Sequence, residues 1–228
     1  IIQKAFKFHS EGNIPEATKY YQSFIKQGFK DCRVFSNYGF ILLSQGNFKD
    51  AELCVRKAIE LKPDYAEAHL NLGNILQGLG HFKEAAISTH KAIELKPDFV
   101  IAHLNLGNIL KNLGKLEDAK FCYHKAIKLK PDLTSAYYSI STLQYSNEDK
   151  IWIEQLFSNE ILNSKSKKGQ VDIYFARANI LHKEKKYDDS SKFLQLANNL
   201  KFDLNPFNHE NFLKKSKTLL LETDKKFL

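Results

Sequence analysis

The stretch His69-Leu70-Asn71-Leu72-Gly73-Asn74-Ile75-Leu76 returns unchanged as His103-Leu104-Asn105-Leu106-Gly107-Asn108-Ile109-Leu110, 34 residues later. A second segment, Lys91 to Asp98, recurs 34 residues earlier as residues 57–64 and, with one substitution, 34 residues later as residues 125–132. A fixed period of this length is typical of a solenoid, in which each repeat packs only on its neighbours. The chain is therefore predicted to be all-α, a right-handed α-solenoid of stacked antiparallel helix pairs. Because solenoids present extended surfaces, binding is favoured over catalysis.

The repeats are punctuated by residues that end helices. Aligned by the period, three full repeats cover 32–65, 66–99 and 100–133, and each contains two amphipathic stretches of about 13 residues. The first stretch ends at a glycine, which can take the left-handed conformation, and the second at a proline, which cannot continue a helix. Asp64, followed three residues later by Glu67, predicts a capping box for the next helix. Each repeat is thus predicted to be helix, turn, helix.

Small residues recur where the two helices of a pair must approach closely. Glycine occupies positions 39, 73 and 107, and alanine occupies two further positions in each second helix. A 34-residue helix pair with glycine, alanine, aromatic residue and proline in this order resembles the tetratricopeptide repeat (TPR) family over 32–133. The resemblance implies a superhelix that binds proteins in its concave groove. His69 and His103 stand where the family usually has an aromatic residue, which Phe35 retains.

The flanking segments follow the pattern less closely. Residues 1–31 are predicted to be an atypical partial N-terminal repeat, 134–163 a degenerate repeat, and 164–170 a linker. A second degenerate repeat is expected over 171–204, and a capping helix or tail over 205–228. Divergent terminal repeats are expected because they shield the ends of a stack. The chain contains no methionine, so we expect it to be part of a longer protein.

Composition excludes several classes of function. The three cysteines form no CxxC pair, and no histidine or carboxylate lies at metal-ligand spacing, so neither a disulfide framework nor a metal site is predicted. No P-loop, GxGxxG or nucleophile motif occurs, so no catalytic or cofactor-binding residue is predicted. The longest apolar runs are too short for a membrane span, and a cytoplasmic location is expected. The net charge is +8, but only three of the 34 basic residues are arginine, which disfavours nucleic acid.

Candidate binding residues lie on the first helix of each pair, which is expected to line the concave side. Asparagine recurs at Asn37, Asn71 and Asn105, with Asn74 and Asn108 on nearly the same helical face. An amide both donates and accepts hydrogen bonds, as a peptide backbone requires. The alternative is that these amides only bond one helix to another. The remaining candidates are Leu70 and Leu104, as apolar contacts, and Arg33 and Lys111, as cations for an acidic group.

Three functions remain open at this stage. The first is a scaffold that binds a peptide or partner protein in the concave groove. The second is the non-catalytic arm of a larger enzyme, because residues from Tyr174 to Leu200 are similar to the repeat that precedes the catalytic domain of bacterial TPR-sulfotransferase proteins. The third and least favoured is nucleic-acid binding through lysine, since the lysines are interleaved with acidic residues.

Overall fold

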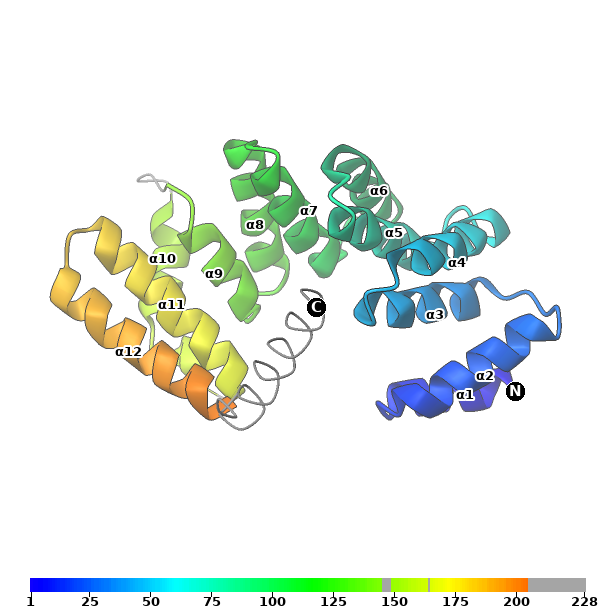
Figure 1. The fold of residues 1–228 in the computed structure, drawn as a ribbon. Helices are drawn as coiled ribbons and strands as arrows, with labels where there is room; N and C mark the ends of the chain where they lie inside the picture. Colours follow the sequence, from blue (N-terminus) through cyan, green and yellow to red (C-terminus); the bar gives the residue numbers. More distant parts are fainter. Residues whose placement is uncertain (145–148, 164, 205–228) are drawn as a thin grey trace, which may run out of the picture. The chain divides into compact units, whose positions relative to one another are not determined.

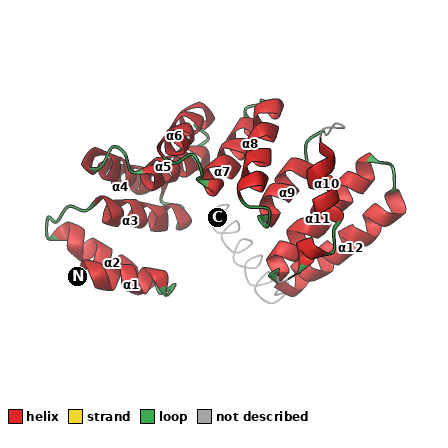
Figure 2. Cartoon of the chain, turned by 180° about the vertical axis from the view of Figure 1, so that it is seen from behind, coloured by secondary structure: helices red, strands yellow, loops and turns green. Residues whose placement is uncertain are grey.

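The computed structural model describes residues 1–144, 149–163 and 165–204, and within these ranges it contains helices and no strand (Figures 1 and 2). The chain divides into two compact units, Ile1–Leu143 and Gln144–Leu228, which are called unit 1 and unit 2 below. The helical pairs predicted from the period are present in unit 1, and the all-α solenoid architecture is confirmed.

Unit 1 is a stack of four helix pairs followed by one short helix. The first helices are α1 (Ile2–Ser10), α3 (Cys32–Ser44), α5 (Ala66–Gly78) and α7 (Val100–Asn112). The second helices are α2 (Ile14–Lys26), α4 (Phe48–Leu61), α6 (Phe82–Leu95) and α8 (Leu116–Leu129), and α9 (Thr134–Ser141) closes the unit. The second helices thus end two residues before Pro63, Pro97 and Pro131, as predicted.

The tight turn within each repeat depends on glycine. Gly46, Gly80 and Gly114 have φ angles of 77°, 80° and 74°, a region that side chains with a Cβ rarely adopt. The residue after Gly46 donates its backbone N–H to the carbonyl oxygen of Leu42 at 2.9 Å, so a carbonyl of the last helical turn is satisfied. These turns keep the two helices of a pair adjacent and antiparallel.

The predicted capping box at Asp64 is wrong. Helix α5 begins at Ala66, so Tyr65 is its N-cap residue, and Tyr65 makes no side-chain capping bond. Because a capping box needs its acceptor at the N-cap position, Asp64 lies one residue too early. Side-chain caps are found instead at Asn13, Asn47 and Asp31.

Neighbouring repeats contact one another mainly where the first helix of one repeat packs on the second helix of the repeat before it, as α5 does on α4 and α7 on α6. Helix α5 also touches α3 and α7, whereas α4, α6 and α8 make at most marginal contacts with each other. Helices α3, α5 and α7 approach their partners at a glycine: a Cβ on Gly39 would lie 2.5 Å from the Val55 side chain, and one on Gly107 would lie 2.5 Å from the Tyr123 ring. The small residues therefore permit close packing, and shallow space remains between the second helices.

Unit 2 contains α10 (Lys150–Phe157), the 3₁₀ turn η2 (Glu160–Leu162), α11 (Lys167–Lys183) and α12 (Tyr187–Leu204). Helix α11 begins at Lys167, within residues 164–170, and α9 lies in unit 1. The capping helix or tail predicted for 205–228 lies outside the described residues. Helices α11 and α12 pack on each other, and the degenerate repeat over 171–204 stays a prediction.

A buried arginine joins the parts of unit 2. Arg177, on α11, is 6% exposed and donates Nε–H to the carbonyl oxygen of Leu156 and Nη2–H to that of Ser158, both at 2.9 Å. Its guanidinium also lies 5.5 Å from the centre of the Phe193 ring. Burial lowers the pKa of Arg177 from its usual value. These bonds satisfy carbonyls at the end of α10, where the helix itself supplies no partner.

Candidate functional site

The candidate residues occupy one surface of unit 1, the side chains that α3, α5 and α7 present away from their partners; this surface is called the first-helix face. Figures 1 and 2 show α3 and α5 on one side of the stack and α4 and α6 on the other. All five asparagines lie on these three helices and are half-buried, so each amide is held by its surroundings yet still reaches solvent. Asn37, Asn71, Asn74 and Asn105 contact a neighbouring repeat, whereas Asn108 contacts α8, the partner of its own helix.

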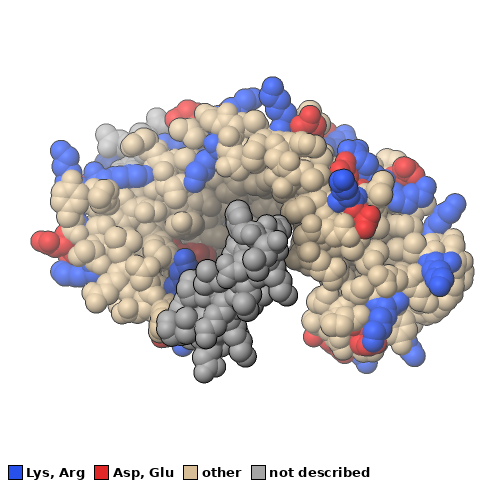
Figure 3. Space-filling view, viewed as in Figure 1, with Lys and Arg blue, Asp and Glu red and all other residues tan. Residues whose placement is uncertain are grey.

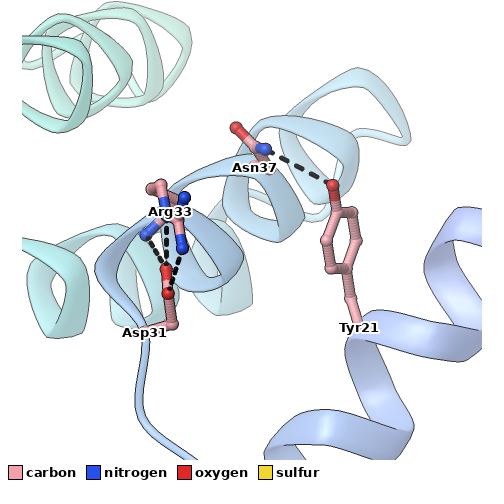
Figure 4. A network of polar contacts seen from close by, with 4 residues as sticks. All are labelled: Tyr21, Asp31, Arg33 and Asn37. Carbon is pink, nitrogen blue, oxygen red and sulfur yellow. Dashed lines mark hydrogen bonds and ion pairs between the residues drawn. The ribbon is translucent and has the colours of Figure 1, made fainter. Parts of the chain in front are cut away.

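At the N-terminal end of this face, Asn37 contacts the preceding pair of helices (Figure 4). Its Nδ2 donates to the Tyr21 hydroxyl oxygen at 3.3 Å, and the same oxygen lies 2.9 Å from Nδ1 of His9. Burial lowers the pKa of His9, which favours the neutral ring, and in the tautomer protonated at Nε2 the Tyr21 hydroxyl donates to Nδ1. Burial raises the pKa of Tyr21, so the hydroxyl keeps its proton.

Asn71, Asn74 and Asn105 bond across the repeats, and Asn108 bonds to the partner helix of its own repeat. Asn71 Nδ2 donates to Ser36 Oγ at 3.0 Å, and Asn105 Nδ2 donates to Asn74 Oδ1 at 2.7 Å. Asn108 Oδ1 accepts from the Tyr123 hydroxyl at 2.9 Å. Each amide therefore bonds one helix to another, which is the role expected if these asparagines serve packing rather than ligand binding.

These bonds leave half of each amide open. Within the described part of the chain, Oδ1 of Asn37, Asn71 and Asn105 accepts no hydrogen bond, and Nδ2 of Asn74 and Asn108 donates none. The first-helix face thus offers acceptors and donors in the same row. An extended peptide backbone, which carries one N–H and one C=O per residue, needs both.

Arg33 is engaged by its neighbour rather than free for a ligand. Its Nε and Nη2 donate to the Asp31 carboxylate at 3.1 and 2.7 Å (Figure 4), and its guanidinium lies 5.0 Å from the centre of the Phe6 ring. Asp31 also accepts from the backbone N–H of Arg33 at 2.8 Å, which caps α3. The hydrogen bond from Arg33 holds the pKa of Asp31 below its ordinary value. A hollow of about 420 Å³ adjoins this pair, lined by Phe6, His9, Ser10, Arg33, Asn37 and Tyr65.

Three predicted residues have other neighbours. Leu70 and Leu104 are only 6% and 8% exposed, and Leu70 packs with Ala92 and Ala102 in a small core cluster. Lys111 is exposed and donates to the hydroxyl of Thr142, the residue that follows α9, at 2.8 Å. The two leucines therefore hold the repeats together, and little of either side chain is available to a ligand.

The repeated histidines have a local structural role that the sequence pattern did not indicate. Nε2 of His69 lies 2.8 Å from the carbonyl oxygen of Pro63, and Nε2 of His103 lies 2.9 Å from that of Pro97. In the next repeat the Tyr137 hydroxyl makes the equivalent bond to Pro131. Each side chain thus satisfies a carbonyl left open where a second helix ends.

No group of three or more His, Cys, Asp or Glu side chains that could hold a metal occurs in the described ranges. None of the helices described there is long and apolar enough to cross a membrane. Lysine and glutamate are interspersed rather than segregated, as the surface of α4 and α6 in Figure 3 shows, and Lys57 and Lys91 pair with Glu60 and Glu94. No single-sign patch that would attract a nucleic acid forms on these two helices.

The protein families that match this sequence agree with the repeated helix pairs described above. Models of the tetratricopeptide repeat match residues 66–99 and 100–133, and a model of the TPR repeat matches residues 39–80. Together these matches cover residues 39–133. Among proteins with curated descriptions, none matches the sequence.

Solved structures with the same TPR fold include two of MamA. "Crystal structure of MamA" has a TM-score of 0.54 and 19% identity, with 89% of this chain and 97% of that chain covered. "MamA 41-end from Desulfovibrio magneticus RS-1" has a TM-score of 0.57 and 19% identity, with 70% of this chain and 90% of that chain covered. At this identity the likeness shows the fold alone. The family matches end at residue 133, so the resemblance of the C-terminal part to the sulfotransferase arm stays a prediction.

Proposed function

We propose that unit 1 is a protein-interaction scaffold that binds an extended peptide, or an extended segment of a partner protein, along its first-helix face. Tetratricopeptide repeats support a binding role without chemistry of its own. The proposal that the ligand is a peptide rests on the five half-buried asparagine amides, which leave both hydrogen-bond donors and acceptors unused. Asn37, Asn71 and Asn105 would accept from peptide N–H groups, while Asn74 and Asn108 would donate to peptide carbonyls.

The bonds between helices strengthen this proposal rather than compete with it. Because each amide is held by a neighbouring helix, its open edge is oriented before a ligand arrives, and little side-chain entropy is lost on binding. The hollow beside Arg33 and Phe6 would take one apolar or polar side chain of the peptide. Since Arg33 is already paired with Asp31, a free acidic terminus is not the expected ligand.

The test must separate recognition from structural support. A peptide is first selected from a random phage-displayed library on the immobilised full chain, and its affinity is then measured by fluorescence anisotropy. Asn71→Ala with Asn105→Ala should weaken binding by roughly tenfold to hundredfold, because two hydrogen bonds of about 1 kcal/mol each are lost.

Ser36→Ala supplies the matched control. It removes the shorter of the two hydrogen bonds that Asn71→Ala removes, the one to Ser36 Oγ, and leaves the Asn71 amide in place with its 3.4 Å bond to the Ser36 carbonyl oxygen. We expect it to lower the melting temperature slightly and to keep peptide affinity within a few-fold of the parent. If every selected peptide binds the double asparagine variant as well as the parent, or if Ser36→Ala weakens binding equally, the amide row does not recognise the peptide.

A further inference from the structure

Three side chains form a chain of hydrogen bonds that runs from α1 through α2 to the first-helix face. Nδ1 of His9 lies 2.9 Å from the Tyr21 hydroxyl oxygen, and that oxygen accepts from Nδ2 of Asn37 at 3.3 Å. Figure 4 shows the Asn37 amide with its nitrogen toward Tyr21 and its oxygen turned away. The open Oδ1 that the proposed peptide site uses therefore depends on the direction of the bond between Tyr21 and Asn37.

The position of the Tyr21 hydroxyl proton sets that direction. Tyr21 is 0% exposed, and within the described ranges the hydrogen-bond partners of its hydroxyl are His9 and Asn37. A hydroxyl donates one proton, so when the proton goes to His9 Nδ1 the oxygen can only accept from Asn37. While the His9 ring is neutral and protonated at Nε2, Asn37 therefore keeps Nδ2 toward Tyr21 and Oδ1 on its open edge.

Protonation of His9 reverses the order of donors and acceptors along this chain of bonds. An imidazolium carries a proton on both nitrogens, so Nδ1 becomes a donor to the Tyr21 oxygen. The hydroxyl proton of Tyr21 then needs another acceptor, and because Tyr21 is fully buried no water can serve. Half a turn of the Asn37 amide places Oδ1 where it accepts this proton. Nδ2 then occupies the open edge of the amide.

The ionisable groups beside His9 belong to its own helix and to the elements around it: Lys7 and Glu11 of α1, Tyr21 of α2, Arg33 of α3 with its partner Asp31, and Tyr65 at the start of α5. Lys7 and Glu11 are exposed and pair with each other at 3.8 Å. Burial raises the pKa of Tyr65 to about 12, and the hydrogen bond between Arg33 and Asp31 raises the pKa of Arg33. Neither group changes its charge near neutral pH. Burial lowers the pKa of His9 from its usual value of 6.5, so the reversal occurs below that pH.

From this chain of bonds we propose that a proton controls peptide binding on the first-helix face: when His9 gains the proton, the Asn37 amide turns and offers the peptide a donor in place of an acceptor. The inference rests on the proposed function, since it concerns the same row of amides. A peptide N–H group opposite Asn37 would then face Nδ2–H, and the hydrogen bond between them would be lost. Affinity should therefore be constant above the pKa of His9 and fall as the pH drops through it.

The effect is confined to the N-terminal end of the row. Asn71 donates to the Ser36 hydroxyl and Asn105 donates to the amide oxygen of Asn74, and neither of these partners gains or loses a proton near neutral pH. The open edges of Asn71 and Asn105 should therefore remain acceptors at every pH at which the protein is folded. Their amide groups provide an internal reference for Asn37.

NMR spectroscopy of the ¹⁵N-labelled full chain tests the reversal without a peptide. As the pH is lowered from about 8 to about 5, the side-chain amide resonances of Asn37 should shift with the same midpoint as the ring nitrogens of His9. Those of Asn71 and Asn105 should not follow this midpoint. In Tyr21→Phe, which keeps the ring and removes the hydroxyl, Asn37 should no longer follow His9. His9→Asn gives the same test if Tyr21→Phe does not fold, because it removes the titrating group and Asn37 should then be insensitive to pH.

Fluorescence anisotropy measures the consequence for binding. The probe is a phage-selected peptide that lacks histidine and that Asn37→Ala weakens. Its affinity for the parent should fall about tenfold over the same pH range, because one hydrogen bond is lost and two N–H groups are left opposed. Tyr21→Phe should remove this pH dependence. His90→Asn, at an exposed histidine of α6, is the matched control and should retain it. Thermal melts at each pH check that the fold is intact.

The possible outcomes separate this inference from the proposed function. The inference is overturned if the Asn37 resonances do not follow His9, if the affinity of the parent is independent of pH, or if Tyr21→Phe keeps the pH dependence of the parent. It is also overturned if Asn37→Ala weakens no selected peptide. In each case the proposed function is still decided by the Asn71→Ala and Asn105→Ala variant, whose amides have no titrating partner.

Discussion

The contact between Gly73 and Thr89 allows a quantitative test of the close packing between paired helices. A methyl group built on Gly73 would overlap the Thr89 hydroxyl and would lie 3.3 Å from Thr89 Cβ and 3.2 Å from the Ala85 carbonyl oxygen. Thr89 is fully buried and β-branched, so it has little freedom to rotate away. Gly73→Ala therefore combines an overpacking cost of about 1–3 kcal/mol with a gain in helix propensity of about 1 kcal/mol.

A double-mutant cycle separates these two terms. In the Thr89→Ala background the overlap with the hydroxyl is gone and only the contacts at 3.2 and 3.3 Å remain, so Gly73→Ala should range from neutral to stabilising by a few tenths of a kcal/mol. Because the helix propensity of residue 73 is the same in both backgrounds, it cancels, and the coupling free energy equals the overlap, about 1–3 kcal/mol.

Urea unfolding followed by circular dichroism measures all four corners of this cycle. The m-values should remain equal, so that the midpoints report stability alone. If the two substitutions are additive to within about 0.5 kcal/mol, Gly73 is not required by the packing of α5 on α6, and the argument for the small residues fails.

Three further predictions rest on buried or half-buried groups. The Thr89 hydroxyl has no hydrogen-bond partner in the described part of the chain, so Thr89→Val should raise the free energy of unfolding by about 1–2 kcal/mol; an unchanged urea midpoint would contradict this. Burial raises the pKa of Cys54 and Cys122 to about 11. At pH 8 the thiolate fraction of each cysteine in the folded protein should therefore be roughly a hundredfold below that of a thiol with the usual pKa. Labelling by iodoacetamide, measured by mass spectrometry, should be slow to the same degree until urea unfolds the chain. The pKa of His9 is lowered by burial, so the unfolded state binds more protons below about pH 6.5 and stability should fall as the pH drops through that value toward the lower folded-state pKa. His9→Asn should flatten this slope in urea titrations at several pH values, and a slope equal to that of the parent would exclude His9 as its source.

Local order could be read from the amino-acid sequence because it depends on residues close together in the chain. Glycine at 46, 80 and 114 follows the first helices and proline at 63, 97 and 131 follows the second helices, so the boundaries of three repeats follow from the period. Where the pattern weakens, the prediction weakens with it: α11 begins inside the expected linker, and the capping residue at the start of α5 is Tyr65 rather than Asp64.

What each side chain contacts was decided by the packing of repeat on repeat. Asn71 and Ser36 are 35 residues apart in the chain, and only the packing of α5 on α3 brings the Asn71 amide within hydrogen-bond distance of the Ser36 hydroxyl. The same packing buries Leu70 and Leu104, which the periodicity placed on the binding surface, and leaves Ile87 and Phe121 beside an open groove. Helix periodicity assigns a residue to a face, whereas the spacing between helices determines whether that face is closed or open to a partner.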